Sequence, residues 1–209
     1  MKLADFLTPL PLVAVLRGIS PAEVPDVAGA LTGAGFRVLE VTLNSPDPYD
    51  SIRALTARCG ATCLVGAGTV IDPSDVARVR EAGGRLIVMP HADVAVIREA
   101  KRQGMVCVPG VATPTEAFAA LAAGADGLKM FPAEALPPAA LRAWRAVLPK
   151  PTLVLAVGGM RPDNLLPYWE AGADGFGTGS NLYKPGAPAA GVRDAALAYA
   201  RGVGALPRR

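Results

Sequence analysis

The sequence predicts an α/β protein in which parallel strands and covering helices form a (β/α)8 TIM barrel. Three observations support this fold. An apolar run followed by a helix recurs along the chain, the helix starts and ends carry regular signals, and about eight such units fill the 209 residues. The chain is 51% hydrophobic and 19% charged, which favours a large buried core over disorder. No linker or low-complexity segment divides it, so we expect one domain over residues 1–209.

Eight apolar runs rich in β-branched residues predict the strands. They begin roughly 21 to 26 residues apart, the length of one compact strand–helix unit. The predicted strands are Leu12–Leu16, Val38–Leu43, Cys63–Thr69, Arg85–Met89, Val106–Pro109, Gly127–Phe131, Thr152–Val157 and Gly175–Gly179. A doubly wound open sheet is the alternative. It is disfavoured because Gly66-Ala67-Gly68 lacks the third glycine of a dinucleotide-binding fingerprint.

Three similar motifs predict helix starts. Each has a capping side chain, a proline at the first helical position and an acid that complements the helix dipole. They are Ser20-Pro21-Ala22-Glu23, Asp72-Pro73-Ser74-Asp75 and Thr113-Pro114-Thr115-Glu116. Glycines mark the predicted helix ends, at Gly35, Gly83, Gly104, Gly124 and Gly172. We also expect a short amphipathic helix within Met1–Leu7 and a C-terminal helix over about Val192–Arg201.

Composition excludes several classes of protein. The formal net charge is only +3 and the basic residues are scattered, so nucleic-acid binding is not predicted. No apolar run is long enough to span a membrane, and the first residues lack the features of a signal peptide. Cys59, Cys63 and Cys107 have no metal-ligand spacing, and we interpret them as small core residues in a reducing cytoplasm. The sequence therefore predicts a cytoplasmic protein without a metal or other cofactor.

Lys129 is the most informative single residue, because it stands inside the apolar strand Gly127–Phe131. A lysine in such a run must lose water from its ammonium group, which is costly. Burial favours the neutral amine, which is nucleophilic. The alternatives are a lysine paired with a buried carboxylate, or one that reaches solvent at the strand end. Together with the rest of the chain, the position favours a lysine that forms a Schiff base.

Glu40 lies in the second predicted strand and Lys129 in the sixth. Even-numbered strands of such a barrel contribute to the same interior layers, so the two side chains can meet although they are far apart in sequence. Each alone has a simpler interpretation as half of a salt bridge. Together, a nucleophilic amine and a carboxylate that transfers protons are what imine chemistry needs.

Two polar residues at strand ends are candidate substrate ligands. Thr69 follows Gly66-Ala67-Gly68, and its hydroxyl can bind a substrate carboxylate; the alternative is a threonine that only closes the strand. Arg17 follows the first strand and can bind a carboxylate or phosphate in bidentate fashion; the alternative is a pair with Glu40. His91, the one histidine, cannot build a zinc site alone, and we expect it in a loop near the mouth of the site.

The last two strands end in small residues that indicate a phosphate site. Gly158 and Gly159 follow the seventh strand, and Gly179 and Ser180 follow the eighth. The loops after these two strands form the recurrent phosphate site of such barrels, where backbone N–H groups approach the anion. Glu134 is expected to be a loop or helix-start charge.

Four motifs resemble one known family. They are Leu39-Glu40-Val41-Thr42-Leu43, Val65-Gly66-Ala67-Gly68-Thr69-Val70, Lys129-Met130-Phe131-Pro132-Ala133 and Val157-Gly158-Gly159. In this order they are similar to the class I 2-dehydro-3-deoxy-phosphogluconate/phosphogalactonate aldolases. The resemblance implies a (β/α)8 barrel, a homotrimer, a metal-independent reaction, Lys129 as the Schiff-base lysine and Glu40 as the proton shuttle. It also implies that Thr69, Gly159, Gly179 and Ser180 bind the substrate.

Within that family the phosphogalactonate branch is the more similar. Leu16–Ile19 and Leu43–Pro46 resemble it, and Val157 stands where the phosphogluconate branch typically has a threonine. The resemblance therefore implies a phosphorylated keto sugar acid of the galactonate configuration as substrate, with Val157 as a specificity position and Arg17 binding a substrate anion. Alternatives are an aldolase for the C4 epimer or for 4-hydroxy-2-oxoglutarate, a non-catalytic sugar-phosphate-binding barrel, and a thiamin phosphate synthase, which would need metal-binding acids at the strand ends.

Overall fold

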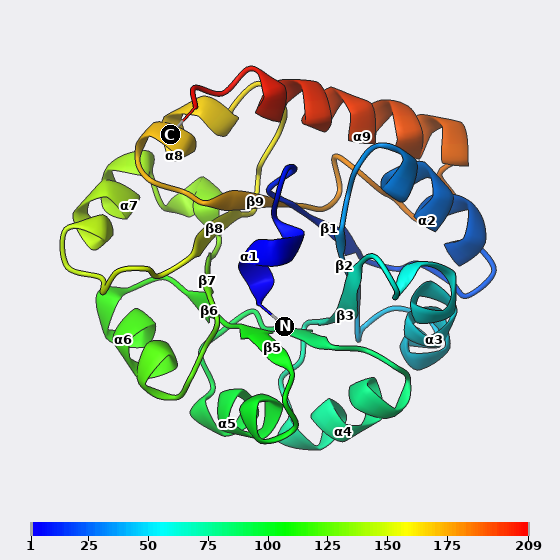
Figure 1. The fold of residues 1–209 in the computed structure, drawn as a ribbon, viewed down its shortest axis with the longest axis horizontal. Helices are drawn as coiled ribbons and strands as arrows, with labels where there is room; N and C mark the ends of the chain where they lie inside the picture. Colours follow the sequence, from blue (N-terminus) through cyan, green and yellow to red (C-terminus); the bar gives the residue numbers. More distant parts are fainter. Residues whose placement is uncertain (1, 209) are drawn as a thin grey trace.

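The strands form one parallel sheet that winds into a nearly closed barrel with the helices outside (Figure 1). The computed structural model describes residues 2–208. The strand order is β5-β4-β3-β2-β1-β9-β8-β7-β6, and neighbouring strands pair in parallel. Because parallel strands are joined by helical crossovers, their carboxyl ends gather at one end of the barrel.

All eight predicted strands are present, with bounds that differ by at most a few residues. They are β1 (Leu12–Leu16), β2 (Val38–Thr42), β3 (Leu64–Gly68), β4 (Leu86–Val88), β5 (Val106–Val108), β7 (Leu128–Met130), β8 (Val154–Val157) and β9 (Gly175–Thr178).

A ninth segment, β6 (Gly110–Val111), was not predicted from the sequence. Only Pro109 separates β5 from β6, and β5 pairs with β4 whereas β6 pairs with β7. The Lys129 N–H donates to the Pro109 carbonyl at 2.8 Å, so this short interrupted stretch joins the two ends of the sheet.

Most helices cover the outer face of the barrel, and the first lies across one end. Their bounds are α1 (Leu3–Phe6), α2 (Val24–Gly33), α3 (Pro48–Cys59), α4 (Pro73–Glu81), α5 (Val94–Arg102), α6 (Pro114–Ala122), the 3-10 turn η1 (Ala133–Ala135), α7 (Pro138–Arg145), α8 (Leu165–Glu170) and α9 (Ala189–Gly204). The predicted C-terminal helix is confirmed and is longer than expected. The five predicted helix-end glycines have φ between 72° and 110°, the left-handed conformation that glycine adopts without strain.

Two of the three predicted helix starts are confirmed. The carboxylate of Asp72 accepts the Ser74 N–H at 2.8 Å, and Thr113 forms a capping box with Glu116. The third is wrong, because α2 begins at Val24 rather than at Pro21. The Glu23 side chain accepts the N–H and hydroxyl of Ser20 at 2.9 and 2.7 Å, as the motif predicts, but residues 21–23 form a turn and Glu23 is the N-cap residue of α2.

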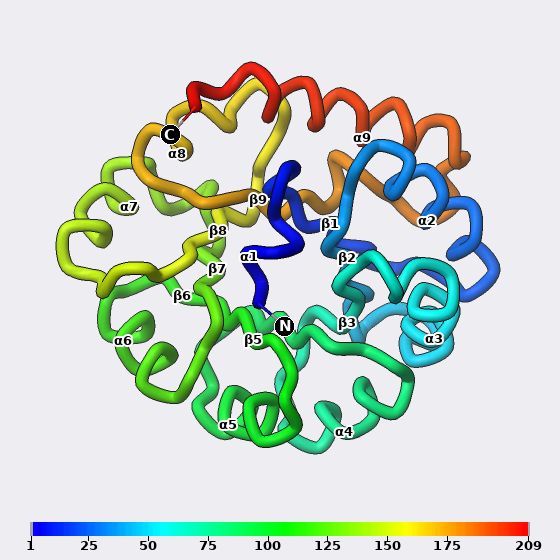
Figure 2. The backbone as a smooth tube through the Cα atoms, in the orientation of Figure 1, coloured from blue at the N-terminus to red at the C-terminus, as the bar shows by residue number. Residues whose placement is uncertain are grey.

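The barrel interior is apolar and is closed at its amino-terminal end. Figures 1 and 2 show α1 lying across the barrel axis. Leu3 and Leu7 pack there against interior side chains such as Val13, Val38 and Leu155. A larger apolar layer lies between the strands and the surrounding helices. The short N-terminal helix predicted from the sequence is thus confirmed and serves as the floor of the barrel; Met1, included in that prediction, lies outside the described residues.

The three cysteines are free and buried, as predicted for core residues. Within residues 2–208, no helix combines the length and apolarity needed to cross a bilayer. The same part of the chain has no group of three or more His, Cys, Asp or Glu residues placed to hold a metal ion.

Candidate active site

Lys129 points into the barrel from the middle of β7. Its neighbours Leu128 and Met130 are fully buried in the outer apolar layer, so the alternation of a strand places Lys129 on the inner face. Only 7% of the residue is exposed, and its ammonium group lies 4.6 Å from the centre of the Phe131 ring. The inward orientation predicted from the sequence is confirmed.

Glu40 occupies the corresponding inner position on β2 and is 1% exposed. The carboxylate fits because Gly68, which pairs with Thr42 at the end of β3, has no side chain where the Glu40 carboxylate lies. A Cβ at Gly68 would lie 2.6 Å from Glu40 Oε1. The other oxygen, Oε2, is buried and has no hydrogen-bond partner among residues 2–208. An unpartnered buried carboxylate oxygen is rare and calls for an explanation.

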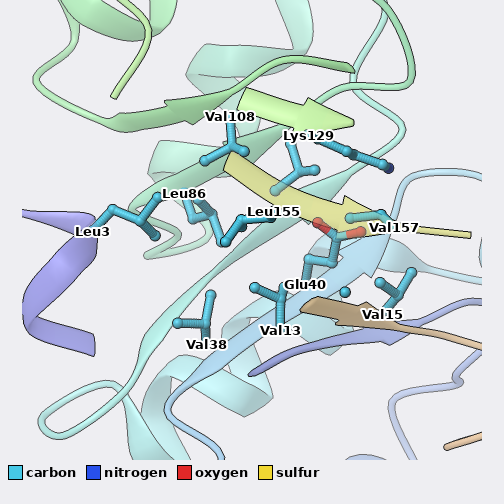
Figure 3. A pocket seen from close by; sticks show the side chains of 12 residues that line it. Leu3, Val13, Val15, Val38, Glu40, Leu86, Val108, Lys129, Leu155 and Val157 are labelled. Atoms are coloured by element: carbon cyan, nitrogen blue, oxygen red, sulfur yellow. The ribbon is translucent and has the colours of Figure 1, made fainter. Parts of the chain in front are cut away.

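The two side chains lie at the same end of the interior, beside Val157 and opposite the Leu3 floor (Figure 3). They do not form an ion pair within 4.0 Å among the described residues. Burial raises the pKa of Glu40, and the charges of Lys129 and Arg17 oppose this shift without cancelling it. Burial lowers the pKa of Lys129, Glu40 opposes the shift and Arg17 adds to it. Both groups are thus shifted toward their neutral forms.

Two neighbouring cavities share Lys129 as a lining residue. An inner cavity of about 10 Å³, roughly the size of one water molecule, is lined by both Glu40 and Lys129. An outer cavity of about 510 Å³ opens beyond it at the carboxyl ends of the strands. Lys129 and Val157 line both cavities. The outer cavity also contains Arg17, Gly158, Gly159, Gly179 and Ser180, which the sequence analysis had singled out.

The glycine turns of the outer cavity require glycine. Gly158 and Gly159 have φ of 103° and 67°, a left-handed pair that other residues adopt only with strain. A Cβ at Gly159 would lie 2.7 Å from Glu134 Oε2. Opposite Val157, a Cβ on Gly177 would lie 2.7 Å from Val157 Cγ2, so Val157 fills a notch left by that glycine.

Arg17 and Thr69 lie nearer the rim. Arg17 is exposed and donates from Nη1 to Asn44 Oδ1 at 3.0 Å, instead of pairing with Glu40. Thr69 is half-buried and has φ of 58°, which is a strained conformation for a β-branched residue. It does not belong to the residues that line the outer cavity. Its role in binding a substrate carboxylate stays a prediction.

Sequence reasoning missed part of the cavity wall. Lys184 and Asn181, after β9, line the outer cavity and were not singled out. Glu134, interpreted as a loop charge, lies in η1 and also lines the cavity. The available signal for Lys184 was its position shortly after Gly179 and Ser180. His91 is exposed in the loop after β4 and is not part of this wall.

The sequence comparisons agree with this geometry. The family model described as KDPG and KHG aldolase matches residues 3–191. The chain belongs to the KDPG and KHG aldolase family. It is therefore a class I aldolase, a carbon–carbon lyase.

Individual relatives lie in the same family. The chain is 51% identical to a probable 2-dehydro-3-deoxy-6-phosphogalactonate aldolase of Rhizobium meliloti, over 90% of this chain and 89% of the relative. It is 48% identical to the 2-dehydro-3-deoxy-6-phosphogalactonate aldolase of Escherichia coli, over 86% and 87% of the two chains. A solved structure described as native KDPGal superimposes with a TM-score of 0.92 at 44% identity, covering 97% of each chain.

Proposed function

We propose that this aldolase cleaves 2-dehydro-3-deoxy-6-phospho-D-galactonate to pyruvate and D-glyceraldehyde 3-phosphate. The observation that carries the proposal is the buried Lys129 amine, unpaired with any acid in residues 2–208, at the junction of the two cavities. Its lowered pKa favours the nucleophilic form. The two relatives near 50% identity carry the name of the phosphogalactonate enzyme.

In the proposed mechanism, neutral Lys129 attacks the C2 ketone and water leaves, which forms an iminium ion. The carboxylate of Glu40, acting through a water in the inner cavity, accepts the proton of the C4 hydroxyl. The C3–C4 bond then breaks, and its electrons flow to the iminium nitrogen. The aldehyde departs and an enamine remains. Protonation at C3 and hydrolysis of the iminium ion release pyruvate and free Lys129.

The proposed ligands are residues that line the outer cavity, together with Thr69, which is assigned from its place at the end of β3 and from the family resemblance. Arg17 and Thr69 are assigned to the C1 carboxylate, as bidentate and hydroxyl donors. The backbone of Gly158, Gly159, Gly179 and Ser180 is assigned to the C6 phosphate. Val157 lies beside Lys129 and presents methyl groups where a hydroxyl would select the other C4 configuration.

We further propose that the chain is one (β/α)8 domain over residues 1–209, with β5 and β6 as two parts of a fifth strand split at Pro109. A homotrimeric assembly and a cytoplasmic location complete the proposal. Sedimentation of the purified chain measures the assembly directly.

Reductive trapping tests the chemistry. Borohydride added with pyruvate is expected to leave a stable pyruvate adduct on Lys129, found by peptide mass analysis. Lys101→Met is the control and is expected to keep the adduct on Lys129, because Lys101 forms an ion pair with Asp126 and does not line the cavity. An unmodified Lys129, or an equal adduct on other lysines, overturns the Schiff-base assignment.

Substrate preference needs a separate measurement. Cleavage of the two C4 epimers, followed by pyruvate detection, is expected to favour the galactonate epimer. A preference for the gluconate epimer, or for 4-hydroxy-2-oxoglutarate, keeps the chemistry and reassigns the substrate.

A further inference from the structure

Lys184 is a cation on the wall of the outer cavity that the mechanism above does not use. It is exposed, and it lines the same space as Gly158, Gly159 and Ser180. Across residues 2–208 no carboxylate forms an ion pair with it. Its ammonium group is therefore available to a ligand.

The loop that carries Lys184 is anchored on both sides of that residue. Glu23 Oε1 accepts the Tyr183 hydroxyl at 2.7 Å and the Gly186 N–H at 2.8 Å. Glu23 Oε2 accepts the N–H and the hydroxyl of Ser20 at 2.9 and 2.7 Å. One carboxylate thus ties the loop after β9 to the turn after β1.

Packing and backbone hydrogen bonds fix the same loop further. A Cβ at Gly18 would lie 2.7 Å from Pro185 Cγ, so the two loops touch at a glycine. The Tyr183 N–H donates to the Gly179 carbonyl and the Ala187 N–H to the Lys184 carbonyl, both at 3.0 Å. Lys184 therefore projects from an ordered backbone, and only its side chain has to be ordered when a ligand binds.

The anchor stays charged across the physiological range. Burial opposes ionisation of Glu23, but the hydrogen bonds from Ser20, Gly186 and Tyr183 lower its pKa to about 2. A charged acceptor makes stronger hydrogen bonds than a neutral one.

The charges of the cavity wall indicate what Lys184 binds. The Gly158-Gly159 turn offers backbone N–H groups, but the carboxylate of Glu134 lies directly against Gly159. An acid in this place repels a phosphate dianion unless a cation shares the wall. Arg17 is held by Asn44 at the end of β1, whereas Lys184 follows the Gly179-Ser180 turn.

We propose that Lys184 binds the phosphate group of the substrate and that Glu23 is the positioning residue that holds it over the cavity. The inference rests on the proposed function, which supplies a phosphorylated substrate. An ammonium group acts as a point charge for phosphate, whereas the glycine turns supply directed N–H groups.

The test compares 2-dehydro-3-deoxy-6-phosphogalactonate with the same acid lacking phosphate. Lys184→Gln is expected to lower the ratio of their kcat/KM values by about tenfold or more, mainly through KM, and to weaken inhibition by inorganic phosphate by a similar factor. Lys184→Arg, which keeps the charge, retains most of the ratio. Glu23→Gln lowers the same ratio by about threefold or more. The Glu23 carboxylate accepts four hydrogen bonds, and the NH2 group of glutamine cannot accept the two made to the oxygen that it replaces. Lys150→Gln removes an exposed lysine outside the cavity and leaves the ratio unchanged.

The outcomes separate the two proposals. Equal losses on both acids, or an unchanged ratio with unchanged phosphate inhibition in Lys184→Gln, overturn the role of Lys184. A loss in Glu23→Gln that is equal on both acids assigns Glu23 to general stability instead. If the wild type cleaves neither acid, the proposed function fails, and calorimetric binding of inorganic phosphate to the wild type and Lys184→Gln still decides the inference.

Discussion

At the scale of single residues, the site brings together two ionisable groups whose surroundings oppose their charges. Lys129 stands in the apolar run Gly127–Phe131, which identified it as unusual from the sequence alone. Glu40 was also identified from the sequence, since it is the one ionisable residue of its predicted strand Val38–Leu43. The space for its carboxylate was not predictable, because it depends on which residue of β3 lies beside the carboxylate in the folded barrel. The strain at Thr69 was hidden for the same reason: the sequence shows a threonine but not its φ of 58°.

Glu40→Gln tests the proton shuttle. The amide keeps the size of the side chain but cannot accept the C4 hydroxyl proton, so kcat is expected to fall by about 100-fold or more. Turnover is followed by reduction of the released pyruvate. Glu170→Gln, an exposed change at the end of α8, is the matched control. Near-normal turnover in Glu40→Gln reassigns the shuttle to another group.

At the scale of elements, the strands were the most predictable part and their junctions the least. Eight strands were predicted from the regular spacing of apolar runs, from their β-branched residues and from the glycines at helix ends, because all three signals are local in the sequence. The β6 segment was missed because it consists of only Gly110 and Val111, and its pairing with β7 is a long-range contact. The start of α2 was predicted three residues too early, because residues 21–23 form a turn. The Glu23 side chain also bonds to Tyr183 and Gly186, long-range contacts that the local motif does not reveal.

Gly68→Ala tests whether the absence of a side chain at the end of β3 makes room for the Glu40 carboxylate on β2. The new methyl group would stand 2.6 Å from Glu40 Oε1, so the carboxylate must move and kcat is expected to fall by about tenfold or more. Gly33→Ala is the control, because nothing lies within 4 Å of its Cβ position near the end of α2. That variant is expected to keep its activity and to gain about 0.5–1 kcal/mol of unfolding free energy. Steady-state kinetics measure kcat, and urea unfolding measures the free energy of unfolding. A Gly68→Ala variant with normal kcat would show that the methyl group does not displace the carboxylate.

At the scale of the whole molecule, the barrel collects charges from distant parts of the sequence at one end. Arg17, Lys129 and Lys184 face the outer cavity together with Glu134, and Glu40 lies just inside. The sequence predicted this convergence for Arg17 and Lys129, because strand ends of a parallel barrel meet. Lys184 was not predicted, since its position depends on how its loop folds back against the turn after β1.

The pH dependence of activity reports on this arrangement. Protonated Lys129 cannot attack the ketone, so kcat/KM is expected to rise with pH as the amine loses its proton. Burial lowers the pKa of Lys129 below its ordinary value of 10.5, so the midpoint of this rise lies below that pH. Arg17→Gln removes a cation that lowers the pKa of both Lys129 and Glu40, and the acid limb therefore moves to higher pH. The measurement is the profile of kcat/KM over about pH 5 to 10 for the wild type, Arg17→Gln and the control Arg193→Gln on α9. If the rise of kcat/KM with pH does not move in Arg17→Gln, the electrostatic role of Arg17 is wrong.

The leucine floor has a consequence for the order of events. Because Leu3 and Leu7 fill the amino-terminal end of the barrel, substrate reaches Lys129 and products leave it through the opposite rim. In the proposed mechanism, the three-carbon fragment bonded to Lys129 is then the innermost, and the phosphorylated aldehyde departs ahead of it. When the enzyme runs backwards to build the sugar acid, the keto acid must be loaded first and the aldehyde second, which makes the synthetic direction compulsorily sequential.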